Sequence, residues 1–123
     1  MSAIDEIIKS NGVEVTELSA PEELDDGLLR CRVRIASNHA QMDYSIVREL
    51  RHCSDSDIVE AAVFDAWEVA TAKSFEDWAV DQGIETEALP SARERFAQMQ
   101  AVAPLVYEVF GGRQAFESLV MTL

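Results

Sequence analysis

The segment Leu28–Ser37 alternates between apolar and cationic side chains, and no other pattern in the chain constrains the fold as strongly. Its central residues run in the order Leu29, Arg30, Cys31, Arg32, Val33, Arg34, Ile35. Successive side chains of a β-strand point to opposite faces of the sheet. The segment is therefore expected to form a strand with an apolar face toward the core and a row of arginines on the other face.

Two further strands are expected beside this one, over Val13–Leu18 and Gln41–Val47. A turn-like, acid-rich loop over Ser19–Gly27 and a hairpin turn at residues 37–40 would connect the three. The core face of the last strand would carry Met42, Tyr44 and Ile46. A short amphipathic helix, Ala3–Ser10, precedes the strands. Short connections between successive strands predict an antiparallel sheet with one solvated face.

The second half of the chain changes to helical periodicity. In Ser54–Ala72 the apolar residues recur on one arc at about 100° per residue, and Ser54 or Ser56 is suited to be the N-cap. Ser74 is expected to cap a second, short helix that runs through Asp81.

A longer helix is expected after the next loop, with Ser91 and Glu94 as its capping box. Pro104 should kink or restart this helix, because proline cannot donate a helical hydrogen bond. Arg113–Met121 would form the last helix. Together these patterns predict an α+β fold in which a three-stranded antiparallel sheet packs against several C-terminal helices, as a single domain over residues 1–123.

The charge of the chain is large and unevenly distributed. The net charge is −13 on 123 residues. Residues 1–29 hold eight acids and one base, residues 30–53 five arginines and two acids, and residues 54–92 ten acids and one lysine. A surface this acidic repels nucleic acid and anionic membranes and attracts basic protein surfaces. The alternative explanation is that the acids serve solubility and local salt bridges.

The sequence offers little catalytic chemistry. His52-Cys53 is the only adjacent pair of a base and a nucleophile, and adjacent side chains rarely point at each other or at a third, orienting group. Cys31 and Cys53 lack the spacing of a metal or redox site, and His39 falls in a predicted turn. We therefore expect no catalytic residue, no cofactor and no metal, and we expect that the chain is not an enzyme.

The arginine row allows two interpretations. It could grip the phosphates of a nucleic acid, which would call for aromatic stacking partners on the same face. Tyr44, on the neighbouring strand, is expected on the core face instead. Alternatively, the arginines pair with acids of this chain such as Glu14 or Asp43. The acidity of the whole molecule favours the second interpretation.

Phe64 and Trp67 are the aromatic residues of the helical half that bear on binding, with Trp67 at the edge of the acidic face. Phe64 lies among the acids of its helix, opposite the apolar arc. It could be a binding anchor, or a kinked C-terminal helix could cover it with Val106, Tyr107 or Phe110, which is favoured in a chain of this length. Trp78 falls one turn into a capped helix and is expected to be buried against the sheet or the 57–72 helix.

The stretch Ala72-Lys73-Ser74-Phe75-Glu76-Asp77-Trp78 resembles a recurrent segment of small uncharacterised proteins carried by bacteriophages and other mobile elements. The order of expected elements also matches the layout of that family along most of the chain. After Gly83 the family often has an aromatic residue and an aspartate, where this chain has Ile84-Glu85. The resemblance implies a role in host interaction, as in small acidic phage proteins that inhibit CRISPR or restriction systems. It assigns no catalytic residue.

Charge and resemblance together predict an anti-CRISPR-like binding protein that inhibits a host defence complex in the bacterial cytoplasm by imitating nucleic-acid phosphates. Its partner would be a basic protein surface, such as a nucleic-acid-binding subunit, and not nucleic acid or membrane. The predicted partner-binding residues are Asp57, Glu60, Phe64, Asp65, Glu68, Glu76, Asp77 and Asp81. The alternative is an accessory or structural phage protein, or a homo-oligomer, whose acidity only keeps it soluble.

Overall fold

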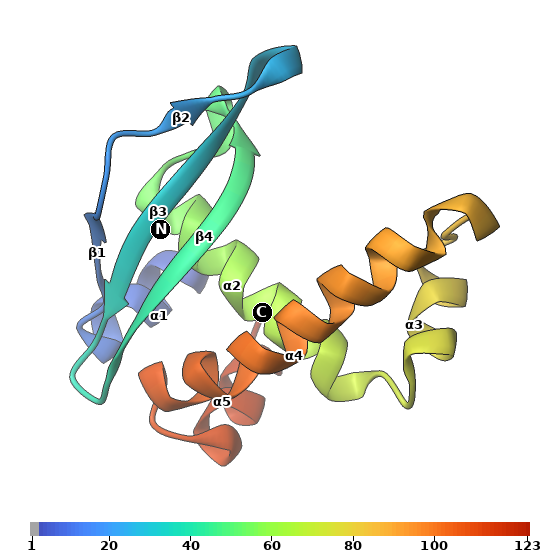
Figure 1. The fold of residues 1–123 in the computed structure, drawn as a ribbon. Coiled ribbons are helices and arrows are strands. Elements are labelled where there is room, and N and C mark those ends of the chain that lie inside the picture. Colours follow the sequence, from blue (N-terminus) through green and yellow to red (C-terminus); the bar gives the residue numbers. More distant parts are fainter. Residues whose placement is uncertain (1–2) are drawn as a thin grey trace.

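The computed structural model describes residues 3–123, and its mixture of helices and antiparallel strands confirms the α+β prediction (Figure 1). In chain order the elements are α1 (Ala3–Asn11), β1 (Glu14–Glu17), β2 (Glu22–Glu23), β3 (Leu28–Ala36), β4 (Gln41–Glu49), α2 (Asp55–Thr71), α3 (Phe75–Asp81), α4 (Leu89–Val109) and α5 (Arg113–Val120). Short 3-10 turns occupy residues 25–27, 50–52 and 86–88.

The sheet is antiparallel and centres on β3. β1 and β2 pair with one edge of β3, and β4 pairs with the other edge along its full length. The expectation of three strands is wrong by one, because β2 forms within the predicted loop, opposite Leu29 and Arg30. A strand of two residues has no periodicity of its own. It is held by pairing with β3 and by an ion pair between Arg30 and Glu22 at 3.3 Å.

The alternation in β3 sets the two faces of the sheet. Cys31, Val33 and Ile35 are buried, whereas Arg32 and Arg34 are exposed, which confirms the predicted strand and its arginine face. β4 follows the same rule, and its buried side chains are Met42 and Tyr44.

α2 begins where its cap predicts and packs behind the sheet. The Oγ of Ser54 accepts a hydrogen bond from the N–H of Asp57 at 3.2 Å. The buried side chains of this helix are Ile58, Val59, Ala62, Val63, Ala66 and Val69. In Figure 1, α2 passes behind β3 and β4, so the apolar faces of the sheet and of α2 meet in the core.

α3 also begins at its predicted cap, where the N–H of Asp77 donates to the Oγ of Ser74 at 3.1 Å. Trp78 is only 3% exposed. The centroid of its ring lies 5.1 Å from that of Phe96 on α4 and 6.0 Å from that of Phe75. The predicted burial of Trp78 is confirmed, and an aromatic cluster of α3 and α4 surrounds it.

The start of α4 and the effect of Pro104 differ from the predictions. The helix begins at Leu89 and not at Ser91, with Pro90 in its first turn, where a missing N–H costs no helical hydrogen bond. The helix also continues through Pro104 to Val109 without restarting. Pro104 lacks the N–H that would donate to the carbonyl of Gln100 in a regular helix. Both residues are exposed, so water can donate to that carbonyl instead.

The apolar faces of these elements share one core. Buried residues from α1, the sheet and the four later helices belong to the same cluster, in which Phe116 of α5 is fully buried. Within residues 3–123, no helix has the length and apolar character needed to cross a membrane.

Candidate functional site

The eight predicted partner-binding residues all lie on α2 and α3, but they do not form one patch. Two of them, Asp65 and Glu68, are half-buried and line a groove. The other six, which we call the outer group, are Asp57, Glu60, Phe64, Glu76, Asp77 and Asp81. Because the 17 residues of α2 extend over about 26 Å, the outer group forms a long track and not a compact site.

The α2 part of the outer group follows from helical spacing. Asp57, Glu60 and Phe64 stand three and four residues apart, which places them on one face. Phe64 is 41% exposed. The favoured expectation that the C-terminal helix covers it is therefore wrong. Val106 and Phe110, which were expected to provide that cover, are buried in the core instead.

The α3 part of the outer group is exposed, and its acids are Glu76, Asp77 and Asp81. Among residues 3–123, only the first has an ion pair, since Arg93 of α4 lies 3.5 Å from the carboxylate of Glu76. A hydrogen bond from its own backbone N–H, together with Arg93, lowers the pKa of Glu76. The N–H of Asp77 donates a hydrogen bond to the Oγ of Ser74, and the residue is exposed.

The charged side chains of the sheet and of the outer group differ in their partners. On the sheet, Arg34 lies 2.9 Å from Asp43, and Arg30 pairs with Glu22, as the second interpretation of the arginine row predicts. Of the five ion pairs among the described residues, only that of Glu76 uses an acid of the outer group. The negative field of α2 and α3 therefore reaches solvent with little compensation from the chain's own cations.

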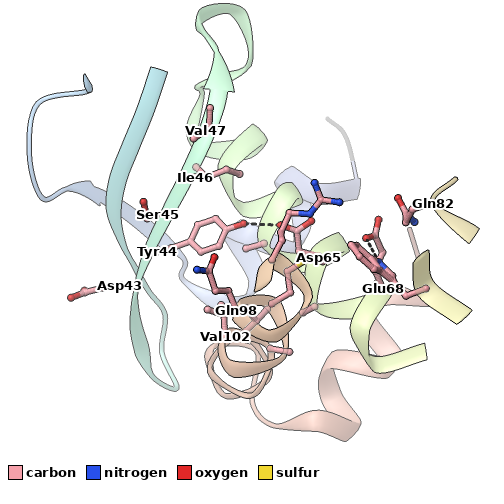
Figure 2. Close-up of a pocket in the computed structure, with 17 residues that line it drawn as sticks. Asp43, Tyr44, Ser45, Ile46, Val47, Asp65, Glu68, Gln82, Gln98 and Val102 are labelled. Atoms are coloured by element: carbon pink, nitrogen blue, oxygen red, sulfur yellow. Dashed lines mark hydrogen bonds between the residues drawn. The ribbon is translucent and has the colours of Figure 1, made fainter. Parts of the chain in front are cut away.

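A groove of about 830 Å³ opens between β4, α2 and α4 and ends near α3 (Figure 2). Residues 43–47 of β4 line one side of it. Ala66 of α2 and Met99 and Val102 of α4 supply much of its apolar lining. Its size lies within the range of ordinary ligand pockets, roughly 300–1,000 Å³.

A partly buried hydrogen bond lies at the floor of this groove. The hydroxyl of Tyr44 on β4 donates to the carboxylate of Asp65 on α2 at 3.1 Å (Figure 2). Burial raises the pKa of Asp65, and it outweighs the Tyr44 hydrogen bond and the nearby Arg48 and Arg95, which favour the ionised form. Burial also raises the pKa of Tyr44, so its hydroxyl stays a donor. A cation placed in the groove would favour the ionised form of Asp65.

Glu68 also turns toward the groove and not toward the outer face on which the helical pattern placed it. The indole Nε1 of Trp78 lies 3.5 Å from the carboxylate of Glu68, and Arg95 of α4 lies 5.2 Å from the centroid of the Trp78 ring. The end of the groove near α3 therefore combines a carboxylate, an indole and a guanidinium.

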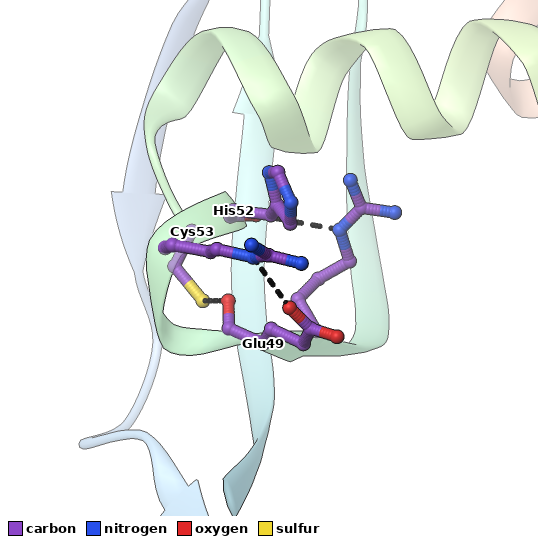
Figure 3. Close-up of polar contacts among 5 residues, drawn as sticks. Glu49, His52 and Cys53 are labelled. Carbon is purple, nitrogen blue, oxygen red and sulfur yellow. Dashed lines mark hydrogen bonds and ion pairs between the residues drawn. The ribbon is translucent and has the colours of Figure 1, made fainter.

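The two cysteines lie close together in the fold. Figure 3 shows the surroundings of Cys53, which lies beside Glu49 and next to His52. The Sγ of Cys53 donates to the carbonyl oxygen of Glu49 at 3.1 Å, and no hydrogen bond joins the His52 and Cys53 side chains in the described structure. The Sγ of Cys31 lies 3.8 Å from the Sγ of Cys53. Burial is the main cause that raises the pKa of the Cys31 thiol. Their separation of 22 residues gave no signal of this contact.

The groove itself was missed by the sequence reasoning. The alternation in β4 predicts which side chains face the core, but it does not say which edge of the strand is paired. The one available signal is the pair of small side chains Ala62 and Ala66, a turn apart on the apolar arc of α2, which leave room above the helix.

No family model matches this chain, and no curated protein or solved structure is significantly similar to it. The resemblance of residues 72–78 to proteins of mobile elements stays a prediction. The outer group and the groove are therefore the two features of the molecule that bear on its function.

Proposed function

We propose that this chain is a non-enzymatic binding protein of a phage or mobile element. It inhibits a host defence complex by occupying the basic nucleic-acid site of one of its subunits. The observation that supports this proposal is the outer group, whose acids are exposed or half-buried and, apart from Glu76, have no ion pair among residues 3–123. The chain as a whole carries −13. The phage setting rests on the resemblance of residues 72–78.

A channel that normally holds nucleic acid attracts such a surface. Its lysines and arginines bind phosphates by charge-assisted hydrogen bonds, and carboxylates accept the same bonds. Opposite fields also steer the two surfaces together and raise the association rate. This steering weakens as salt shortens the Debye length, which is about 8 Å at physiological ionic strength.

The acids of α2 are sparser than the phosphates they would replace. The outer group has two acids on α2, Asp57 and Glu60, on a helix of about 26 Å, whereas one strand of DNA presents about seven phosphates over that length. The acids would therefore satisfy only part of the basic side chains in a channel. Phe64, which is exposed one turn after Glu60, adds an apolar anchor that a phosphate track lacks.

The arginine row is a poor competing nucleic-acid site, although Arg32 has no ion pair among residues 3–123. Arg30 and Arg34 are paired with Glu22 and Asp43, and these carboxylates would repel phosphates approaching the same face. We therefore expect the purified protein to bind neither DNA nor RNA.

Competition measurements test the proposal. Purified CRISPR effector and restriction complexes are loaded with fluorescent nucleic acid, and the chain is titrated into each. We expect release of nucleic acid from at least one complex, with an apparent affinity that falls tenfold or more between about 0.05 M and about 0.2 M salt. Retention of nucleic acid by every complex, or release that does not depend on salt, would contradict the proposal. The accessory or oligomeric alternative would then be preferred.

A further inference from the structure

The outer edge of β4 is a long unpaired strand edge. β4 spans nine residues and pairs only with β3 within residues 3–123. In an antiparallel ladder, alternate residues direct their N–H and C=O groups away from the neighbouring strand, so an edge strand leaves these groups without strand partners. Proteins commonly protect such edges with prolines, lysines or short strands. Gln41–Glu49 contains neither proline nor lysine.

The groove gives this edge the room that an added strand needs. Residues 43–47 of β4 line it, a length of about 17 Å in extended conformation. The opposite side is formed by Gln98, Met99 and Val102 of α4, and the floor by α2 (Figure 2). A strand laid along β4 would direct alternate side chains onto this apolar floor and the others to solvent.

We propose that the β4 edge and the groove bind an extended, basic peptide segment of a partner protein, which adds to the sheet as a further strand. Backbone hydrogen bonds to β4 would supply part of the affinity, and the floor would select alternating apolar side chains. This inference goes beyond the proposed function, because it requires neither a defence complex nor the outer group.

The charges of the groove favour a basic occupant. Asp65 and Glu68 lie along its floor, and Arg95 is the cation among its lining residues. Asp43 also lines the groove but is already paired with Arg34 at 2.9 Å. The carboxylates of Asp65 and Glu68 therefore make the field around the groove negative, which attracts an added strand that carries lysine or arginine. The net charge of −13 acts in the same direction.

A second copy of this chain is a poorer occupant of the edge. Pairing of β4 with β4 about a two-fold axis would bring another net charge of −13 to the same place. It would also gather the Asp65 and Glu68 carboxylates of both copies around one interface, where like charges oppose association.

The test uses a capped peptide of about eight residues that alternates valine and lysine, a length that covers the groove. Two peptide controls accompany it: the same sequence with every second backbone nitrogen methylated, and an alternating valine and glutamate peptide. Binding to the full chain is followed by calorimetry and by the amide NMR signals of Gln41–Glu49. We expect a Kd of about 100 µM or tighter. Both control peptides should bind at least about tenfold more weakly, because one lacks backbone donors and the other repels the carboxylates.

Two matched variants on α4 locate the site. Gln98→Trp places a bulky ring in the groove, whereas Gln100→Trp places the same ring on an exposed position that does not line it. Both replaced side chains are exposed, so circular dichroism should show an unchanged fold. We expect Gln98→Trp to weaken peptide binding at least about tenfold and Gln100→Trp to leave it within about twofold. Glu60→Lys, in the outer group, should not impair binding, which separates this test from that of the proposed function.

Several results would overturn the inference. These are no binding of the valine–lysine peptide at about 1 mM, equal binding of the N-methylated peptide, and equal binding to Gln98→Trp. A dimer in sedimentation experiments that Gln98→Trp dissociates would make a second copy the occupant of the edge and would also overturn it.

Discussion

The sheet and the α2–α3 region both carry charged side chains on their outer faces, but these charges meet different partners. On the sheet, strand pairing places Arg30 and Arg34 of β3 beside acids of β2 and β4, which neutralise them, whereas Arg32 has no ion pair among the described residues. On α2 and α3, the acids of the outer group face solvent, and Glu76 alone has an ion pair among the described residues. Paired charges support the fold, whereas unpaired like charges oppose it until a partner compensates them. This difference is the reason for assigning the partner surface to the helices.

The largest expected effect is the difference in stability loss between a buried and an exposed aromatic residue of the α2–α3 region. Trp78→Ala should lower the free energy of unfolding by about 3–5 kcal/mol, because it removes a buried ring from the cluster with Phe75 and Phe96. Phe64→Ala should cost less than about 1 kcal/mol, because that side chain is 41% exposed. Urea melts of both variants measure the difference. Similar losses would show that Phe64 belongs to the core and not to an interaction surface.

A smaller effect concerns the carboxylate in the groove. The pKa of Asp65 is raised in the fold above its ordinary value of 3.8, so the folded state holds this proton more tightly than the unfolded state. The resulting stability is complete below 3.8 and is lost as pH rises through the folded pKa. Asp65→Asn cannot ionise, and its amide oxygen can still accept from Tyr44. Its stability relative to the natural chain should therefore increase as pH rises.

Urea melts from about pH 3 to about pH 7 measure this change, because it falls between the ordinary value of 3.8 and the raised pKa of Asp65 in the fold. Asp81→Asn, at an exposed position of α3, is the matched control and should show no such trend. A flat difference for Asp65→Asn would show that burial does not raise the pKa of Asp65, and the Tyr44–Asp65 contact would then be more open than described.

The smallest expected effect compares one acid from each region. Glu60→Gln removes an unpaired charge from the outer group and should raise Tm by about 1–2 °C at low salt. Asp43→Asn removes the partner of Arg34 on the sheet and should lower Tm. Both shifts should shrink at about 0.5 M salt, because exposed charges are screened. Shifts of the same sign at low salt would contradict the difference between the two faces.

Much of the fold could be predicted because local signals and tertiary packing agree in it. The alternation in β3 predicts both its conformation and its buried face, since one side of the sheet must cover the core. Ser54 and Ser74 mark the starts of α2 and α3, because an N-cap satisfies orphan N–H groups with local geometry alone.

Most of the failures originate in partners that are distant in sequence, and the start of α4 is a local exception. β2 exists only through its pairing with β3. Ser91 was a suitable cap, but Pro90 is compatible with an earlier helix start. Phe64 stays exposed because the side chains expected to cover it pack inward. The free edge of β4, and with it the groove, depends on β1 and β2 sharing the opposite edge of β3, which no local pattern determines.

The central claim is that the outer group, and not the net charge alone, forms the partner surface. The most direct measurement is the association rate with a complex that releases its nucleic acid, at about 0.05 M salt. The double variant Glu60→Lys/Asp81→Lys is compared with Glu14→Lys/Glu17→Lys, which reverses two exposed acids of β1 and changes the net charge equally. We predict that the first lowers the association rate at least about tenfold and the second less than about threefold. Equal losses from the two variants would contradict the account.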